Sequence, residues 1–121
     1  MVKILFVDDD HTTLDLMKHV AQICGYLALV CSSGLKALDM AIKEKPDLIM
    51  VDLNLQDIHG TTFINKLRKK RKIASTPVVI LTAEKIFDNE VDEKISGADG
   101  YIQKPLRIND LPEAVKTYIK A

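Results

Sequence analysis

Four apolar runs of the sequence each end in polar side chains that can take part in chemistry. Asp8–Asp10 follow the first run, Asp52 follows another, and Thr82 and Lys104 follow two more. Carboxylates held close together raise one another's pKa and destabilise a fold unless a cation compensates them. Mg²⁺ and Mn²⁺ prefer such oxygen ligands. A single aspartate after a strand is better explained as a turn residue or helix cap, but the whole set favours a metal site.

These side chains meet only if the apolar runs are neighbouring strands of one sheet. The expected strands are Val2–Val7, Leu27–Cys31, Leu48–Val51, Pro77–Leu81 and Gly100–Ile102. Most are apolar at successive positions, which is typical of strands buried on both faces of a parallel sheet. The carboxyl ends of parallel strands share one edge of the sheet, and ligands bind there in open α/β folds.

Apolar residues at helical spacing occupy the segments between the expected strands. The stripes expected to face the sheet are Leu14, Met17, Ala21 and Cys24; Leu35, Leu38 and Ile42; Phe63 and Leu67; and Leu111, Ala114, Val115 and Tyr118. The segment Glu84–Ser96 has the thinnest stripe, so it is expected to be the helix that shifts most readily. Five strands alternating with five helices predict an α/β domain with right-handed crossovers.

Composition places the chain among ordinary globular proteins. Its 121 residues suit one domain, its formal net charge is zero, and nearly half of its residues are hydrophobic. No apolar run approaches the roughly 20 residues of a membrane span and no signal peptide is evident, so a cytoplasmic protein is expected. Cys24 and Cys31 are expected to be buried, reduced thiols. Because Ala121 coincides with the end of the last expected helix, no output domain is expected.

Four motifs appear in order at the ends of predicted strands. They are VDD at Val7–Asp9, VDLNL around Asp52, LTA at Leu81–Ala83 and GADGYIQKP at Gly97–Pro105. Together they resemble the receiver domain of two-component response regulators over essentially the whole chain, residues 1–121. The resemblance implies a flavodoxin-like, doubly wound (βα)5 sandwich with a five-stranded parallel sheet in the order 2-1-3-4-5. Asp8, Asp9 and Asp52 would then converge.

The resemblance also implies a role for each residue of the site. Asp52 is the expected phosphoacceptor, and Lys104 and Thr82 complete the reactive site. Asp9 and Asp52 are expected to bind Mg²⁺ or Mn²⁺ directly, Asn54 through its backbone carbonyl and Asp8 through water. The small side chain of Ala83 is expected to leave space beside the phosphoryl group, and the peptide bond between Lys104 and Pro105 is expected to be cis. Asn54 and Glu84 are expected to control how long the acyl phosphate lasts. Gln56 replaces the proline usual in the family, for which a tuning effect is expected.

Signalling by such a domain is expected to depend on two conformational states. Phosphorylation adds a charge of about −1.5 to −2 and shifts the balance through contacts that differ between the states. Thr82 and Tyr101 are the expected switch residues, and the face formed by the fourth helix, fifth strand and fifth helix is the expected output. A histidine kinase or phosphotransfer protein is expected to donate the phosphoryl group to Asp52, and the sequence does not identify the pathway. The chain is not expected to be an enzyme, although it would take part in its own phosphorylation and dephosphorylation. Phosphorylation is expected to control a partner protein or dimerisation.

Three other functions fit the sequence less well. A haloacid-dehalogenase-like phosphatase needs a second acid where Asn54 stands, and a flavin carrier needs a phosphate-binding loop where Asp8–Asp10 would repel phosphate. A receiver-fold interaction module that is never phosphorylated is the main alternative, against which the set of Asp52, Thr82 and Lys104 argues.

Two further groups of side chains have interpretations unrelated to phosphoryl transfer. The basic run Lys66–Lys72 is either a patch that binds nucleic acid or an acidic partner, or the solvated end of a helix. The solvated helix end is favoured because no aromatic residues interleave with the cations. His11, His19 and His59 lack metal-ligand spacing.

Overall fold

The computed structural model describes residues 1–85 and 97–119. Its elements are β1 Lys3–Val7, α1 His11–Ile23, β2 Leu27–Cys31, α2 Gly34–Glu44, β3 Leu48–Val51, α3 Gly60–Arg68, β4 Val78–Thr82, β5 Gly100–Gln103 and α5 Asp110–Tyr118. All five predicted strands are present, and the helix predicted over Glu84–Ser96 lies almost wholly outside the described residues. None of the described helices has the length and apolar character that crossing a membrane requires.

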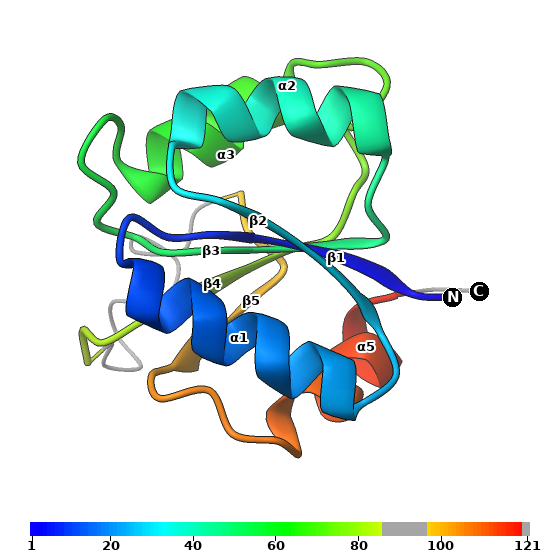
Figure 1. The fold of residues 1–121 in the computed structure, drawn as a ribbon. Coiled ribbons are helices and arrows are strands. Elements are labelled where there is room, and N and C mark those ends of the chain that lie inside the picture. The colour runs from blue at the N-terminus through cyan, green and yellow to red at the C-terminus, as the bar shows by residue number, and fades with distance from the viewer. Residues whose placement is uncertain (86–96, 120–121) are drawn as a thin grey trace.

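The strands form one parallel sheet in the predicted order β2-β1-β3-β4-β5. Val7 is paired with both Cys31 and Val51, so the carboxyl ends of β1, β2 and β3 lie side by side in the sheet. Figure 1 shows the three layers, with α2 and α3 over one face of the sheet and α1 and α5 over the other. The predicted flavodoxin-like α/β architecture is therefore confirmed.

Two apolar cores separate these layers. Because side chains alternate across a strand, Leu5 of β1 packs with the α2 and α3 side while the adjacent Phe6 packs with the α1 and α5 side. Ile49 and Met50 of β3 divide in the same way. Every residue of β3 and β4 is buried, which confirms the prediction of strands covered on both faces.

The edge strand β2 departs from that prediction. Leu27 is 43% exposed and the other residues of β2 are half-buried, because β2 has only β1 as a neighbour. Cys31 lies in this strand and Cys24 follows α1, and both are free thiols that are only half-buried. The prediction of buried thiols is therefore wrong about their burial.

Helix α2 faces the sheet through small residues, and this rotates its buried stripe away from the predicted one. Gly34, Ala37, Leu38 and Ala41 are buried, whereas Leu35 is 49% exposed. A Cβ at Gly34 would lie 2.7 Å from Ile58 Cγ1, so α2 begins in close contact with the segment before α3. The prediction that Leu35 packs on the sheet is wrong.

Candidate functional site

The carboxyl edge of the sheet brings together the polar residues singled out in the sequence. The Asp52 N–H donates to Val7 O at 2.9 Å, and the Lys104 N–H donates to Thr82 O at 2.7 Å. Both bonds continue a strand ladder by one residue beyond the strand end. The backbones that carry Asp52 and Lys104 are thus fixed by the sheet itself, although both residues lie in loops.

Three carboxylates form the centre of the site. One oxygen from each of Asp8, Asp9 and Asp52 lies within 4.8 Å of the other two. Asp8 is fully buried and Asp52 is 9% exposed. The spacing and the oxygen-only ligands suit a hard divalent cation such as Mg²⁺. Asp10 is not part of this cluster, because its carboxylate accepts a hydrogen bond from Thr13 Oγ1 at 2.6 Å at the start of α1.

Lys104 supplies the positive charge of the site. Its Nζ donates to Asp8 Oδ2 at 2.6 Å and lies 3.6 Å from Asp52 Oδ2. Asp8 also accepts a hydrogen bond from the Asp10 N–H at 2.9 Å. The peptide bond between Lys104 and Pro105 is cis, which confirms the conformation implied by the resemblance.

Burial raises the pKa of the Asp52 carboxyl above its ordinary value. The Lys104 ammonium lowers that pKa, while the charges of Asp8 and Asp9 raise it further. A carboxyl whose pKa is raised by folding is destabilised when ionised, and a bound cation would relieve that cost. The electrostatics of Asp52 therefore agree with a metal-assisted site.

Thr82 ends β4 at the same edge of the sheet. It is 1% exposed, and its Oγ1 accepts a hydrogen bond from the Glu84 N–H at 3.1 Å. A hydroxyl keeps one donor hydrogen when it accepts, so Thr82 can still donate to an oxygen placed in the site. Ala83 is exposed and Glu84 is half-buried beside it. The Thr82 backbone is joined to that of Lys104, since its carbonyl accepts the Lys104 N–H.

Tyr101 lies in β5, paired with Ile80, and is half-buried against the core on the α2 and α3 side. Its role as a switch stays a prediction, because most of the segment after β4 that would respond to it lies outside the described residues. The described part of the expected output face is β5 with α5.

The loop after Asp52 is fixed by contacts that sequence reasoning missed. Asn54 and His59 form an antiparallel bridge, and the Asn54 N–H lies 3.5 Å from Asp52 Oδ1. Asp57 accepts hydrogen bonds from Ser33 Oγ at 2.7 Å and from the Gly34 and Leu35 N–H groups at 3.0 Å. The loop therefore caps α2. An aspartate close to a serine that precedes a helix is too common a pattern to have indicated this contact.

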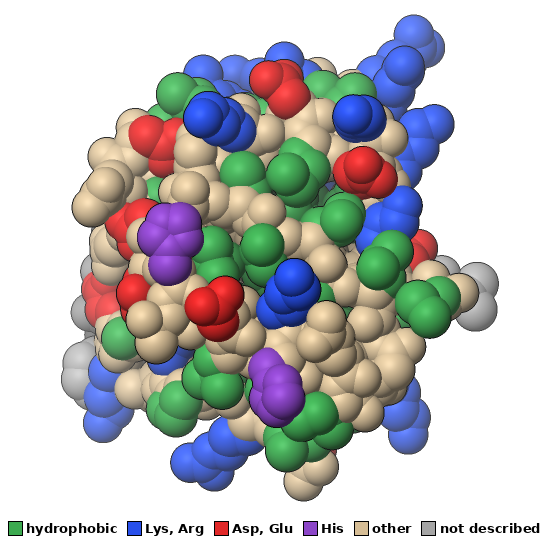
Figure 2. All heavy atoms as spheres, in the orientation of Figure 1, with side chains coloured by type: hydrophobic (Ala, Val, Ile, Leu, Met, Phe, Trp, Pro, Cys, Tyr) green, Lys and Arg blue, Asp and Glu red, His purple; other side chains and the backbone are tan. Residues whose placement is uncertain are grey.

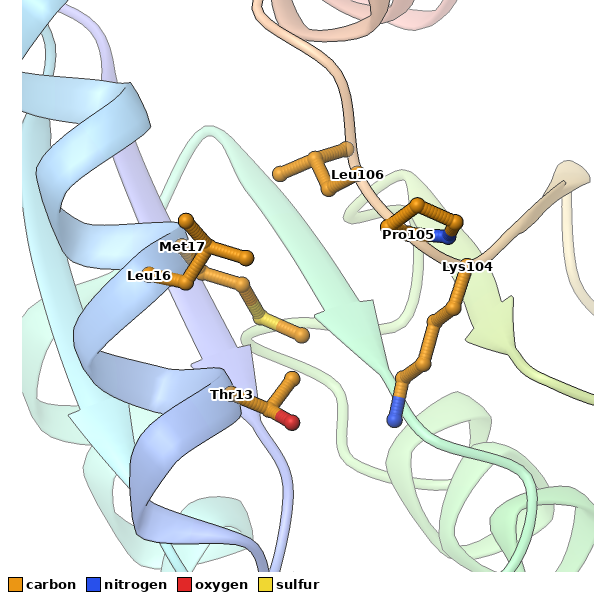
Figure 3. Close-up of a pocket in the computed structure, with 6 residues that line it drawn as sticks. All are labelled: Thr13, Leu16, Met17, Lys104, Pro105 and Leu106. Atoms are coloured by element: carbon orange, nitrogen blue, oxygen red, sulfur yellow. The ribbon is translucent and has the colours of Figure 1, made fainter.

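An apolar pocket of about 290 Å³ adjoins the site. Figure 3 shows Lys104, Pro105 and Leu106 on one side of it and Thr13, Leu16 and Met17 of α1 on the other. Leu16 is 46% exposed at this position. The only indication of this pocket in the sequence was Leu16, an apolar residue next to the predicted buried stripe of α1.

Comparisons with known proteins agree with this geometry. The family model of the response regulator receiver domain matches residues 4–116. The chain is 32% identical over 120 residues to the DNA-binding dual master transcriptional regulator RpaA of Synechocystis sp., covering 99% of this chain but only 50% of that protein. It is 28% identical to the polar-differentiation response regulator DivK of Brucella ovis, covering 96% of this chain and 94% of DivK.

Solved structures give the same result. The chemotaxis protein CheY4 of Vibrio cholerae matches with a TM-score of 0.87 and 29% identity, over 98% of both chains. A response regulator from Chloroflexus aurantiacus matches with a TM-score of 0.85 and 30% identity, covering 95% of this chain and 94% of that one. With the family model spanning nearly all of the sequence, the chain belongs to the response regulator receiver domain family.

Proposed function

We propose that Asp52 accepts a phosphoryl group from the phosphohistidine of a histidine kinase or phosphotransfer protein, in a reaction that requires Mg²⁺. The observation that carries the proposal is the buried Asp52 carboxylate beside both Lys104 and two further acids. In the reaction, an Asp52 oxygen attacks phosphorus and forms an O–P bond. The P–N bond of the donor breaks, and its electron pair stays on the imidazole.

The residues of the site would divide the work between them. Asp9 and Asp52, with Asp8 through water and the Asn54 carbonyl, would hold Mg²⁺, which supplies charge neutralisation at the phosphoryl oxygens. The Lys104 ammonium, 3.6 Å from Asp52, is close enough to pair with a second phosphoryl oxygen. The remaining hydrogen of the Thr82 hydroxyl would donate to a third.

These contacts differ between the two chemical states of Asp52, so they can shift a conformational equilibrium. We propose that Thr82 and Tyr101 transmit the shift to the face that includes β5 and α5, which then controls a partner protein or dimerisation. A shallow hollow of about 150 Å³ on this face, lined in part by Ile102, Glu113 and Tyr118, supports a docking role.

The pocket between α1 and Lys104 supports the proposal about the donor. It opens beside Lys104, and an apolar side chain of the donor placed there would hold the phosphohistidine close to Asp52. Because such donors act inside the cell, we place the protein in the cytoplasm.

The experiment is an amide NMR titration with Mg²⁺ and beryllofluoride, which mimics a phosphoryl group. Wild-type protein is expected to shift at Thr82, Lys104 and Tyr101, whereas Asp52→Asn is expected not to respond to beryllofluoride. Asp15→Asn, which changes an exposed carboxylate of α1, is the matched control and should respond like wild type. If wild type binds neither ion, the chain is instead an interaction module that works without phosphorylation.

The same variant gives a prediction about stability. Without Mg²⁺ at neutral pH, Asp52→Asn should raise the free energy of unfolding, because the folded state raises the pKa of Asp52 and so disfavours its ionised form. The advantage should disappear when pH falls below the ordinary pKa of aspartate, and urea unfolding at both pH values measures it. Equal stability of the two proteins at neutral pH would contradict the proposed electrostatics of the site.

A further inference from the structure

The basic segment that ends α3 contains two kinds of cation. Arg68 is structural, because its guanidinium donates to Gly97 O, Ala74 O and Thr76 O and pairs with Asp99 at 3.0 Å. It ties the end of α3 to the segments that lead into β4 and β5. The other cations of the segment have no such role.

These other cations are Lys66, Lys69, Lys70, Arg71 and Lys72. All five are exposed, and none of their side chains makes a hydrogen bond or ion pair with another residue in the described part of the chain. A helix dipole stabilises cations only within the last turn, and α3 ends at Arg68. Favourable interaction with the dipole therefore does not account for a cluster that continues to Lys72.

Three of the lysines border an apolar groove between α2 and α3. The groove has a volume of about 320 Å³ and is lined by Leu35, Leu38, Lys66, Lys69 and Lys70. Leu38 is buried, while Leu35 is 49% exposed. In the view of Figure 2, Lys and Arg side chains lie along the upper edge, where α2 and α3 lie in Figure 1, with several Asp and Glu side chains among them. The charged residues that line the groove itself are all lysines.

We propose that this groove, named here the α2–α3 groove, binds an acidic segment of a partner protein that inserts one apolar side chain between Leu35 and the lysines. Carboxylates of the segment would pair with the ammonium groups, and its apolar side chain would contact Leu35, Leu38 and the lysine stems. Nucleic acid fits less well, because none of the residues that line the groove is aromatic and able to stack on bases.

This interaction is separate from phosphoryl transfer, because no residue of the groove belongs to the Asp52 site. A test therefore distinguishes the two proposals. The probe is the labelled peptide Glu-Glu-Leu-Phe-Glu-Glu, titrated into the isotope-labelled protein at low ionic strength and followed by amide NMR and fluorescence anisotropy. Asp52→Asn is expected to bind the peptide as wild type does, whatever the outcome of the beryllofluoride experiment.

Two charge-reversal variants test the location of the site. Lys66→Glu/Lys69→Glu reverses two cations of the groove, and Arg71→Glu/Lys72→Glu makes the same change of net charge outside it. We expect the first variant to weaken binding roughly tenfold or more and the second less than about threefold. Replacing the central Leu-Phe pair of the peptide with Ser-Ser should also weaken binding by roughly tenfold, since apolar contact is lost.

The outcomes decide the proposal. Peptide-induced shifts centred on Leu35 and Leu38, with the expected difference between the two variants, support it. Equal loss in both variants, equal binding of the two peptides, or a Kd weaker than roughly 1 mM for the Leu-Phe peptide would overturn it. If duplex DNA or vesicles containing phosphatidylserine bind more tightly than the peptide, and the groove variant loses that binding, the cations would be assigned to those partners instead.

Discussion

Removing the carboxylate of Asp57 is expected to destabilise the protein through helix α2, although Asp57 lies in the loop after Asp52. Asp57 accepts hydrogen bonds from the first two N–H groups of α2, at Gly34 and Leu35, and Ser33 Oγ accepts from the third, at Lys36. Helix N–H groups at this end have no partner within the helix. The side chains of Asp57 and Ser33 therefore accept the hydrogen bonds of the first three N–H groups of α2.

The magnitude follows from the hydrogen bonds and the pKa of Asp57. Partial burial opposes ionisation, but donation from Leu35, Ser33 and Gly34 outweighs it and lowers the pKa from 3.8 to about 2. The difference corresponds to at most about 2.5 kcal/mol. Because the carboxylate is exposed, screening reduces this to about 1 kcal/mol, within the range measured for loss of a helix cap. We expect Asp57→Asn to lower the free energy of unfolding by about 1 kcal/mol at pH 7.

The dependence on pH identifies the cause. A carboxyl whose pKa is lowered by folding stabilises the protein above its ordinary pKa, and this contribution is lost as pH falls toward about 2. Urea unfolding of wild type and Asp57→Asn at pH 7 and near pH 2.5 should therefore show a difference that shrinks with acidification. Asp39→Asn, an exposed carboxylate of α2 without a partner among the described residues, is the control. Equal losses in both variants, or a difference independent of pH, would refute the capping argument.

Two substitutions at the site itself have separate expected outcomes. Lys104→Met leaves the fully buried Asp8 without its ion-pair partner, so urea unfolding should show a loss of about 2–4 kcal/mol that Mg²⁺ partly restores. Lys3→Met, which removes the more exposed Lys3–Glu44 pair, should cost no more than about 1 kcal/mol, and a similar cost in both variants would contradict the prediction. Gly60→Ala places a Cβ 2.9 Å from Asp52 O, so it should destabilise the protein by about 1–3 kcal/mol and slow beryllofluoride binding. Gly25 has φ +83° and open space around it, so Gly25→Ala should lower the free energy of unfolding without affecting beryllofluoride binding. An unchanged binding rate in Gly60→Ala would show that the Asp52 backbone does not depend on Gly60.

The fold and the members of the site were predictable because both follow from the order of residues along strands. Each strand end is marked by a change from apolar to polar side chains, and parallel strands bring their carboxyl ends to one edge. The sequence therefore predicted that Asp8, Asp52 and Lys104 would meet, and the ion pairs of Lys104 with both aspartates confirm it. Apolar patterning also predicted which strands are covered on both faces, except at the edge strands β2 and β5.

Contacts that depend on helix rotation or on loop conformation were not predictable. Leu35 and Leu38 have the same side-chain chemistry, but the small residues of α2 decide which of them faces the sheet. Asp57 caps a helix more than twenty residues earlier in the sequence, and no local pattern marks such a pairing. In the sequence, Arg68 and the five neighbouring cations form one basic run, although within the described residues Arg68 alone among them makes side-chain contacts that stabilise the fold.

The charges of the site suggest why phosphorylation of Asp52 should act through β4 and β5. Three carboxylates facing one ammonium leave an excess of negative charge that a divalent cation could cancel. A phosphoryl group on Asp52 would bring new negative oxygens to the same place. Among the described side chains, the Lys104 ammonium, which follows β5, and the Thr82 hydroxyl, which ends β4, are the donors that could meet these oxygens. Because the sheet fixes both backbones, the response would fall to the side chains and to the segments that follow them, and Lys104 would divide its three N–H donors between Asp8 and the phosphoryl group.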